Sequence, residues 1–222
     1  MCGRYTLRSP AANVARAFQV DATPSLFPRY NISPTQSVPI VRQAAAREMV
    51  LARWGLVPSW ASDLSIGYKL INARSETADS KPSFRSAFRQ RRCLVVADGF
   101  YEWKKNGAKH KQPFHIHLND GSVFGFAGLW EHWQSAEGEV VESCTILTTE
   151  ANALMKDLHD PMPVILGPAD YDRWLDLSAK DVAALQALLV PFPDEGMIST
   201  AVSSYVSNAR NEGPKCLDPA ST

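Results

Sequence analysis

The alternation of hydrophobic and polar side chains predicts a protein built mainly from short strands. Such alternation places successive side chains on opposite faces, so that one face is buried and the other exposed. The predicted strands cover residues 4–7, 37–43, 48–54, 92–97, 99–105, 114–118, 123–130, 141–149 and 162–166. Turn signals at Asn106-Gly107 and Asn119-Asp120-Gly121 join three of these strands into a meander.

Helical segments are short and lie between the strands. Ser9 and Pro10 predict the N-cap and first residue of a helix that buries Val14 and Phe18. Further helices are predicted over 76–90 with a break at Pro82, over 150–158, over 168–175, and from an N-cap at Ser178 with Asp181 three residues later. The two prolines within residues 27–35 exclude a helix interior or a central strand there, and predict an ordered loop.

Many short strands with helices between them are typical of an α+β fold. We expect a single domain over residues 1–222, with mostly antiparallel strands curled into a barrel-like sheet and helices at its periphery. The length of 222 residues suffices for one full core and is short for two. Residues 215–222, a polar stretch with a proline, are expected to form a loose tail.

Composition narrows the class of protein. The formal net charge is zero, which excludes a uniformly basic nucleic-acid coat but leaves room for a local basic patch. Neither a secretory leader nor an apolar span of ~20 residues is visible, so a cytoplasmic protein is expected, with a monomer as the default. The cysteines, at 2, 93, 144 and 216, form no C-x-x-C pair, so we expect no metal site and no cofactor.

Cys2 directly follows the initiator methionine. Once Met1 is removed, the Cys2 thiol and a free α-amine sit on adjacent carbons and form a 1,2-aminothiol. A terminal amine with a pKa of roughly 7.7–8.0 is partly neutral at pH 7 and can attack an aldehyde, after which the thiol can close a thiazolidine ring. The alternative is an ordinary cysteine in a frayed terminus.

Four further positions have side chains suited to this chemistry. Glu102 lies in a strand among aromatic residues, where burial would raise its pKa toward the range of a general acid. His159 lies between a helix and a strand, and Asn72 and Arg74 share one face of a short strand, where they could hold an anion or a carbonyl oxygen. Each also has a structural interpretation: a salt-bridged glutamate, a core histidine, and surface hydrogen bonding.

Basic residues alternate with aromatic ones near these positions, which favours single-stranded nucleic acid as a partner. Trp60 and Trp103 are examples of the rings, and Arg4 and Arg74 of the cations. A buried aromatic core and a solvated arginine face explain the same pattern. Cysteine, histidine and asparagine together also match the composition of a papain-like triad, but their order and spacing do not fit that family.

The combined motifs resemble the SOS-response-associated peptidase (SRAP) family, whose members process abasic sites. They follow one another along nearly the whole chain: Met1-Cys2-Gly3-Arg4, residues 29–35, 54–58, 71–77 and 92–104, Leu158-His159-Asp160 with Met162-Pro163-Val164, and residues 206–214. The resemblance implies removal of Met1 by the protein itself and a thiazolidine crosslink between Cys2 and the ring-opened abasic site in single-stranded DNA. It also implies weak lyase activity and association with the nucleoid while on DNA.

The resemblance assigns roles to individual residues. Cys2 matches the nucleophile, Asn72 and Arg74 the substrate-holding residues, Glu102 the acid/base group and His159 a second proton-transfer group. The expected DNA contacts are Gly3, Arg4, Asn31, Pro34, Trp60 and Arg74. Pro161 stands where the family commonly has an arginine, which removes one possible phosphate contact.

Two other functions remain open at this stage. A non-catalytic module would bind single-stranded nucleic acid reversibly, whether or not a base is missing. An N-terminal-nucleophile hydrolase would use Cys2 against peptides or amides. Both lack the covalent product that abasic-site capture requires.

Overall fold

The computed structural model describes residues 2–106 and 110–220, and within them strands dominate. The strands are β1 (Tyr5–Leu7), β2 (Arg29–Ile32), β3 (Ser37–Gln43), β4 (Arg47–Trp54), β5 (Asn72–Arg74), β6 (Arg92–Ala97), β7 (Gly99–Asn106), β8 (His110–Leu118), β9 (Phe124–Gln134), β10 (Val140–Thr149), β11 (Met162–Pro163), β12 (Ile165–Leu166) and β13 (Met197–Ala201). The α-helices are α1 (Ala11–Phe18), α2 (Ser75–Ala78), α3 (Arg85–Gln90), α4 (Ala153–Lys156), α5 (Tyr171–Leu175) and α6 (Val182–Gln186).

A barrel forms the centre of the molecule. Within the described residues, β10, β4, β3, β6 and β9 pair in that order, and β9 pairs back onto β10. The pairing of β10 with β4 is parallel, whereas the other pairings around the barrel are antiparallel. Closure removes exposed sheet edges and encloses a core of apolar side chains. The predicted α+β, barrel-like, mostly antiparallel single domain is confirmed.

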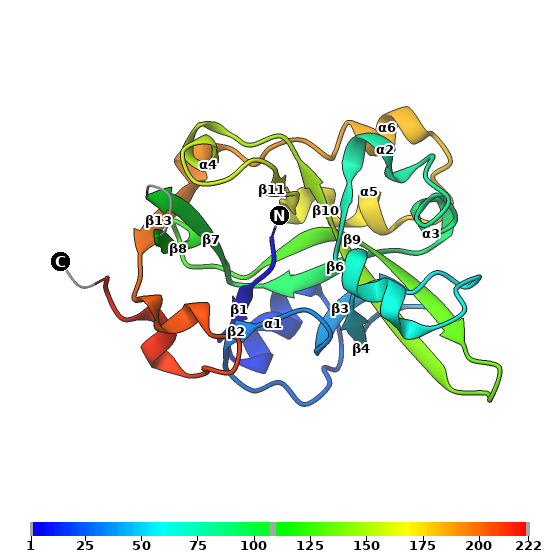
Figure 1. Ribbon diagram of the computed structural model, residues 1–222. Coiled ribbons are helices and arrows are strands. Elements are labelled where there is room, and N and C mark those ends of the chain that lie inside the picture. The colour runs from blue at the N-terminus through cyan, green and yellow to red at the C-terminus, as the bar shows by residue number, and fades with distance from the viewer. Residues whose placement is uncertain (1, 107–109, 221–222) are drawn as a thin grey trace.

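A second sheet lies beside the barrel and contains the N-terminal strand. Its order is β13-β8-β7-β1-β2, and all its pairings are antiparallel. Figure 1 shows the helices around the outside of the two sheets, with the N-terminus near the middle of the view. β1 lies between β7 and β2, so the chain that leads into it from Cys2 is held on both sides.

Several predicted local features differ in detail. Ser9 is not the N-cap of α1: Pro10 takes that position, and the backbone N–H and hydroxyl of Ser9 donate to the Asp98 carboxylate. The last helix begins after Asp181, whose carboxylate accepts from Ala183 N and Ala184 N, and not after Ser178. In both cases a carboxylate accepts hydrogen bonds that the predicted caps did not account for.

Two segments expected to lack helices and strands contain regular structure. Residues 27–35 contain β2, which can form because the two prolines flank the strand and do not interrupt it. β2 lies at the edge of its sheet. Residues 214–217, expected in a loose tail, form a 3-10 helix that buries Cys216, and Ser203 N donates to Asp218 O. Residues 221–222 and the predicted turn residue Gly107 lie outside the described residues.

Candidate active site

The backbone of Cys2 is held by a side chain from a distant strand. Asn72 Nδ2 donates to Cys2 O at 2.8 Å. Asn72 begins β5, which pairs with β10 of the barrel through Ile146. The start of the chain is therefore fixed against the barrel by a residue 70 positions away in sequence.

Glu102 approaches the same region from β7. Side chains alternate along this strand, so Phe100 and Glu102 share one face while Tyr101 and Trp103 share the other. The Glu102 side chain is only 3% exposed. Burial raises the pKa of Glu102 to about 7, although the backbone N–H of Trp103 acts in the opposite direction. A carboxyl group with this pKa can both give and accept a proton at neutral pH.

The thiol of Cys2 is fully buried, with no exposed surface. Burial raises the pKa of Cys2 well above its usual value, and the negative charge of Glu102 raises it further. The thiol is therefore protonated at neutral pH. A negative charge on Glu102 would therefore further disfavour the thiolate of Cys2.

His159 lies in the loop between α4 and β11, and its side chain is half-buried. Its Nδ1 lies 3.1 Å from Pro161 O, and because a carbonyl oxygen can only accept, Nδ1 carries the proton. In the neutral ring Nε2 is then an acceptor. Burial lowers the pKa of His159, although the hydrogen bond to Pro161 O and the negative charge of Asp160 act in the opposite direction. The neutral, proton-accepting form is thus favoured at neutral pH.

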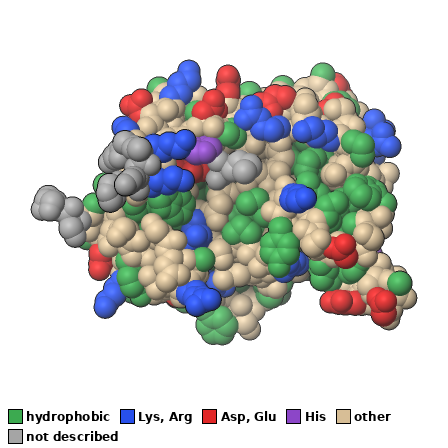
Figure 2. All heavy atoms as spheres, in the orientation of Figure 1, with side chains coloured by type: hydrophobic (Ala, Val, Ile, Leu, Met, Phe, Trp, Pro, Cys, Tyr) green, Lys and Arg blue, Asp and Glu red, His purple; other side chains and the backbone are tan. Residues whose placement is uncertain are grey.

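The predicted DNA contacts differ in how available they are. Arg74 is about half exposed and pairs with Glu76 at 3.3 Å. Trp60 is 60% exposed, and Gly3 and Pro34 are half-buried. Figure 2 shows Lys and Arg side chains spread over the face that contains the N-terminus, without a single basic patch. Binding of a phosphate backbone to this face would therefore depend on individual Lys and Arg side chains and not on the overall charge.

Asn31 does not fit its expected role as a DNA contact. Its side chain is 1% exposed, and its oxygen accepts from Arg4 Nη1 at 2.8 Å. Its nitrogen donates to the carbonyl oxygens of Val206, Asn208 and Asn211. Both ends of the amide are thus bonded inside the protein, so direct contact with DNA is disfavoured. The sequence showed the motif but not these partners, which lie some 175 to 180 positions away.

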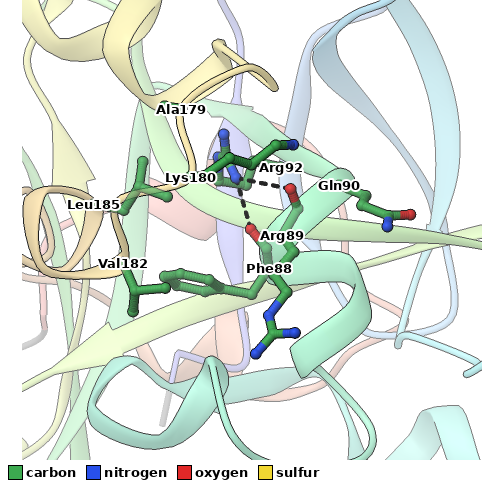
Figure 3. A pocket seen from close by; sticks show the side chains of 8 residues that line it. All are labelled: Phe88, Arg89, Gln90, Arg92, Ala179, Lys180, Val182 and Leu185. Atoms are coloured by element: carbon green, nitrogen blue, oxygen red, sulfur yellow. Dashed lines mark hydrogen bonds between the residues drawn. The ribbon is translucent and has the colours of Figure 1, made fainter.

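A separate cavity of about 380 Å³ lies between α3 and α6. Its lining contains none of the predicted site residues, and Figure 3 shows Arg92 at its wall. Arg92 donates to the carbonyl oxygens of Phe88, Arg89, Trp174 and Asp176, at the ends of α3 and α5. These bonds satisfy carbonyl groups left open at helix C-termini, which gives Arg92 a structural role.

No group of three or more His, Cys, Asp or Glu side chains among the described residues is placed to hold a metal ion. None of their helices has the length and apolar character needed to cross a membrane.

Comparison with known proteins identifies the family. The sequence model of the SOS response associated peptidase (SRAP) family matches residues 1–209. The chain belongs to the SRAP family. The abasic site processing protein YoqW of Bacillus subtilis is 41% identical, with 98% of this chain and 99% of that protein covered. The abasic site processing protein HMCES of Pongo abelii is 35% identical, over 99% of this chain and 76% of that protein.

The fold is also similar to solved structures. A crystal structure of a protein from Bacteroides thetaiotaomicron has a TM-score of 0.88 and 26% identity, and covers 99% of this chain and 100% of that one. This SRAP protein therefore shares its whole architecture, including the second sheet that holds Glu102, with that protein.

Proposed function

We propose that this SRAP protein, after loss of Met1, captures the ring-opened aldehyde of an abasic site in single-stranded DNA as a thiazolidine on Cys2. The observation that supports the proposal is that burial raises the pKa of Glu102 to about 7, while the charge of the same carboxylate acts on the Cys2 thiol. The names of the relatives, abasic site processing proteins, support the same substrate.

The chemistry needs a group that both donates and accepts protons. An abasic sugar is mostly a closed hemiacetal. Protonation of its ring oxygen by Glu102, with return of the anomeric hydroxyl proton to the same carboxylate, would open it to the aldehyde and leave the acid protonated. The Cys2 amine then attacks the aldehyde carbon, and water leaves with a proton from the acid, which gives an iminium. The Cys2 sulfur attacks the iminium carbon while the thiol proton passes to the Glu102 carboxylate or to His159 Nε2. Aldehyde and aminothiol thus give a thiazolidine and one water.

Glu102 and His159 would divide the proton transfers by their surroundings. Glu102 is nearly fully buried and holds its proton up to about pH 7, which suits the steps that need an acid. His159 is half-buried with a lowered pKa, which suits acceptance of a proton. Asn72, through its bond to Cys2 O, would hold the reacting residue still.

Removal of Met1 fits the same groups. The Cys2 sulfur would attack the Met1 carbonyl carbon while Glu102 moves the thiol proton to the departing Cys2 amine, and water would then hydrolyse the thioester. A proton acceptor is needed because the buried thiol is protonated at neutral pH. Where the iminium forms but the ring does not close, β-elimination would give weak lyase activity.

The test uses purified protein whose intact mass shows loss of Met1. Incubation with an oligonucleotide that carries one abasic site should give a heat-resistant protein–DNA band. Cys2→Ala should abolish it, and Cys2→Ser, which keeps the amine, should give a band only after borohydride reduction of the Schiff base. Cys144→Ala, which changes a cysteine buried in the barrel, is the control and should keep the band. Absence of a band with the processed wild type, or its survival in Cys2→Ala, would overturn the proposal.

A further inference from the structure

Arg4, two residues after Cys2, is a cation whose partners among the described residues are neutral groups. Its Nη1 donates to Asn31 Oδ1 at 2.8 Å and to Val206 O at 3.0 Å. Its guanidinium carbon lies 5.6 Å from the centre of the Trp103 ring. Among the described residues no carboxylate pairs with Arg4, whose side chain is half-buried and whose Nε is enclosed without a hydrogen-bond partner. The neutral partners therefore fix the guanidinium through Nη1 and leave its charge uncompensated.

The groups that fix Arg4 come from opposite ends of the chain. Asn31 lies on β2, and Val206 lies in the C-terminal segment, which we define as residues 203–220. Asn31 Nδ2 donates to Val206 O at 3.3 Å, Asn208 O at 3.1 Å and Asn211 O at 2.8 Å. The amide of Asn31 thus has two roles. Its oxygen accepts from Arg4, and its nitrogen holds the loop whose Val206 O is the second acceptor for Arg4.

The C-terminal segment is attached at further points. Glu212 accepts from Tyr30 N at 2.5 Å and from Arg29 Nε at 3.2 Å. Ser207 Oγ accepts from Trp103 Nε1 at 3.0 Å, so the same segment holds the ring over which Arg4 lies. Asn211 and Glu212 lie beyond residue 209, where the match to the family model ends.

We propose that Asn31 is a positioning residue which, with residues 206–212, orients Arg4 to bind a phosphate next to the captured abasic sugar. Buried amide groups are well suited to this task, because a neutral partner fixes the guanidinium without cancelling its charge. A carboxylate at position 31 would fix it equally well and would remove the attraction for phosphate. The inference rests on the proposed function for its substrate, single-stranded DNA.

The experiment measures reversible binding of single-stranded DNA that carries a tetrahydrofuran abasic analogue, which has no aldehyde and forms no crosslink. The logarithm of the binding constant is followed against the logarithm of salt concentration, where each phosphate contact on a single strand contributes about 0.7 to the slope. Arg4→Ala should lower the slope by about that amount. Asn31→Ala should lower it equally, and the double variant should lower it no further.

Two more variants separate positioning from simple loss of structure. Asn31→Asp is nearly isosteric and should also lower the slope by about 0.7, because its carboxylate neutralises Arg4. Asn208→Ala removes a side chain of the same type but keeps the carbonyl oxygen that Asn31 contacts, and it should behave as wild type. The inference is overturned if Asn31→Ala and Asn31→Asp keep the wild-type slope, whatever their melting temperatures, or if the Asn31 and Arg4 effects add.

The outcomes distinguish this inference from the proposed function. A wild type that crosslinks abasic DNA while Asn31 variants keep its slope would disprove the positioning role alone. A wild type that does not crosslink, with equal and non-additive slope changes in Arg4→Ala and Asn31→Ala, would disprove the capture chemistry alone. Binding by wild type that does not depend on salt would disprove the phosphate contact on which the inference depends, and would leave the capture chemistry to the crosslinking assay.

Discussion

Two buried carboxylates lie four positions apart, Asp98 just before β7 and Glu102 within it, and they have opposite properties. Both side chains are nearly inaccessible, at 2% and 3% exposed. Burial acts to raise the pKa of Asp98, but hydrogen bonds from Thr6, Arg8 and Ser9 outweigh it and leave that pKa below its usual value. Burial of Glu102 is not offset in this way, and its pKa is raised to about 7.

Burial alone therefore does not make a carboxylate reactive. Asp98 accepts from Thr6 Oγ1 at 2.7 Å, from Arg8 N at 2.6 Å, and from Ser9 N and Oγ at 2.9 and 3.0 Å. These donors stabilise its charged form and join the N-terminal strand to β7. At Glu102 the effect of burial on the pKa outweighs the groups that favour the charged form, so this carboxyl can exchange a proton near neutral pH. One carboxylate organises the fold, and the other is suited to chemistry.

The largest expected effect concerns the rate of capture. Glu102→Gln cannot give or take the proton, so the rate of crosslink formation at pH 7 should fall by about 10²–10⁴-fold. Single-turnover gel assays with abasic DNA measure this rate. Asp98→Asn serves as the matched control and should keep the wild-type rate per folded molecule. If Asp98→Asn slows capture as much as Glu102→Gln does, the two carboxylates do not have separate roles.

The next effect concerns stability. Asp98→Asn replaces one acceptor oxygen by a donor that faces other donors, so the free energy of unfolding should fall by about 3–5 kcal/mol. Glu102→Gln should not lower the free energy of unfolding at pH 8, because it removes a buried charge. Urea denaturation at pH 8 measures both. Equal stability of Asp98→Asn and wild type would show that its hydrogen bonds contribute little to the fold.

The pH dependence of stability should have opposite signs at the two sites. The pKa of Glu102 is raised from 4.5 to about 7 on folding, so its contribution is complete below 4.5 and is lost as pH rises through 7, about 3 kcal/mol in all. The pKa of Asp98 is lowered below 3.8, so its contribution is present above 3.8 and is lost as pH falls. Subtracting the unfolding free energy of each Gln or Asn variant from that of wild type, across pH, isolates the two curves. Curves of the same sign would contradict the comparison.

Much of the fold could be predicted because local patterns determine it. The hairpin of β3 and β4 follows directly from alternation and a short turn, and the predicted strand 37–43 matches β3 in full. The parallel pairing of β10 with β4, which closes the barrel, joins residues some 90 positions apart and leaves no local signal. The burial of Cys216 against Tyr101 and Val206 is likewise a property of the folded surface and not of the polar sequence around it.

The candidate site shows the same division. Residue type and motif nominate Cys2, Asn72, Glu102 and His159 as candidates, because their chemistry is visible in the side chains. They single out Glu102 and not Asp98, but the hydrogen-bond donors that distinguish the two acids are visible only in the fold. The amide of Asn31 is enclosed by the far end of the chain, and a polar residue in a proline-rich stretch gives no sign of this.

The most direct test of this account is the titration of Glu102 itself. Carbon-13 NMR of the labelled glutamate carboxyl groups, assigned by comparison with Glu102→Gln, follows its protonation in the protein without DNA. A midpoint near pH 7 is expected. A midpoint near 4.5 would contradict it, because Glu102 would then be fully charged at neutral pH and could not supply the proton that capture requires.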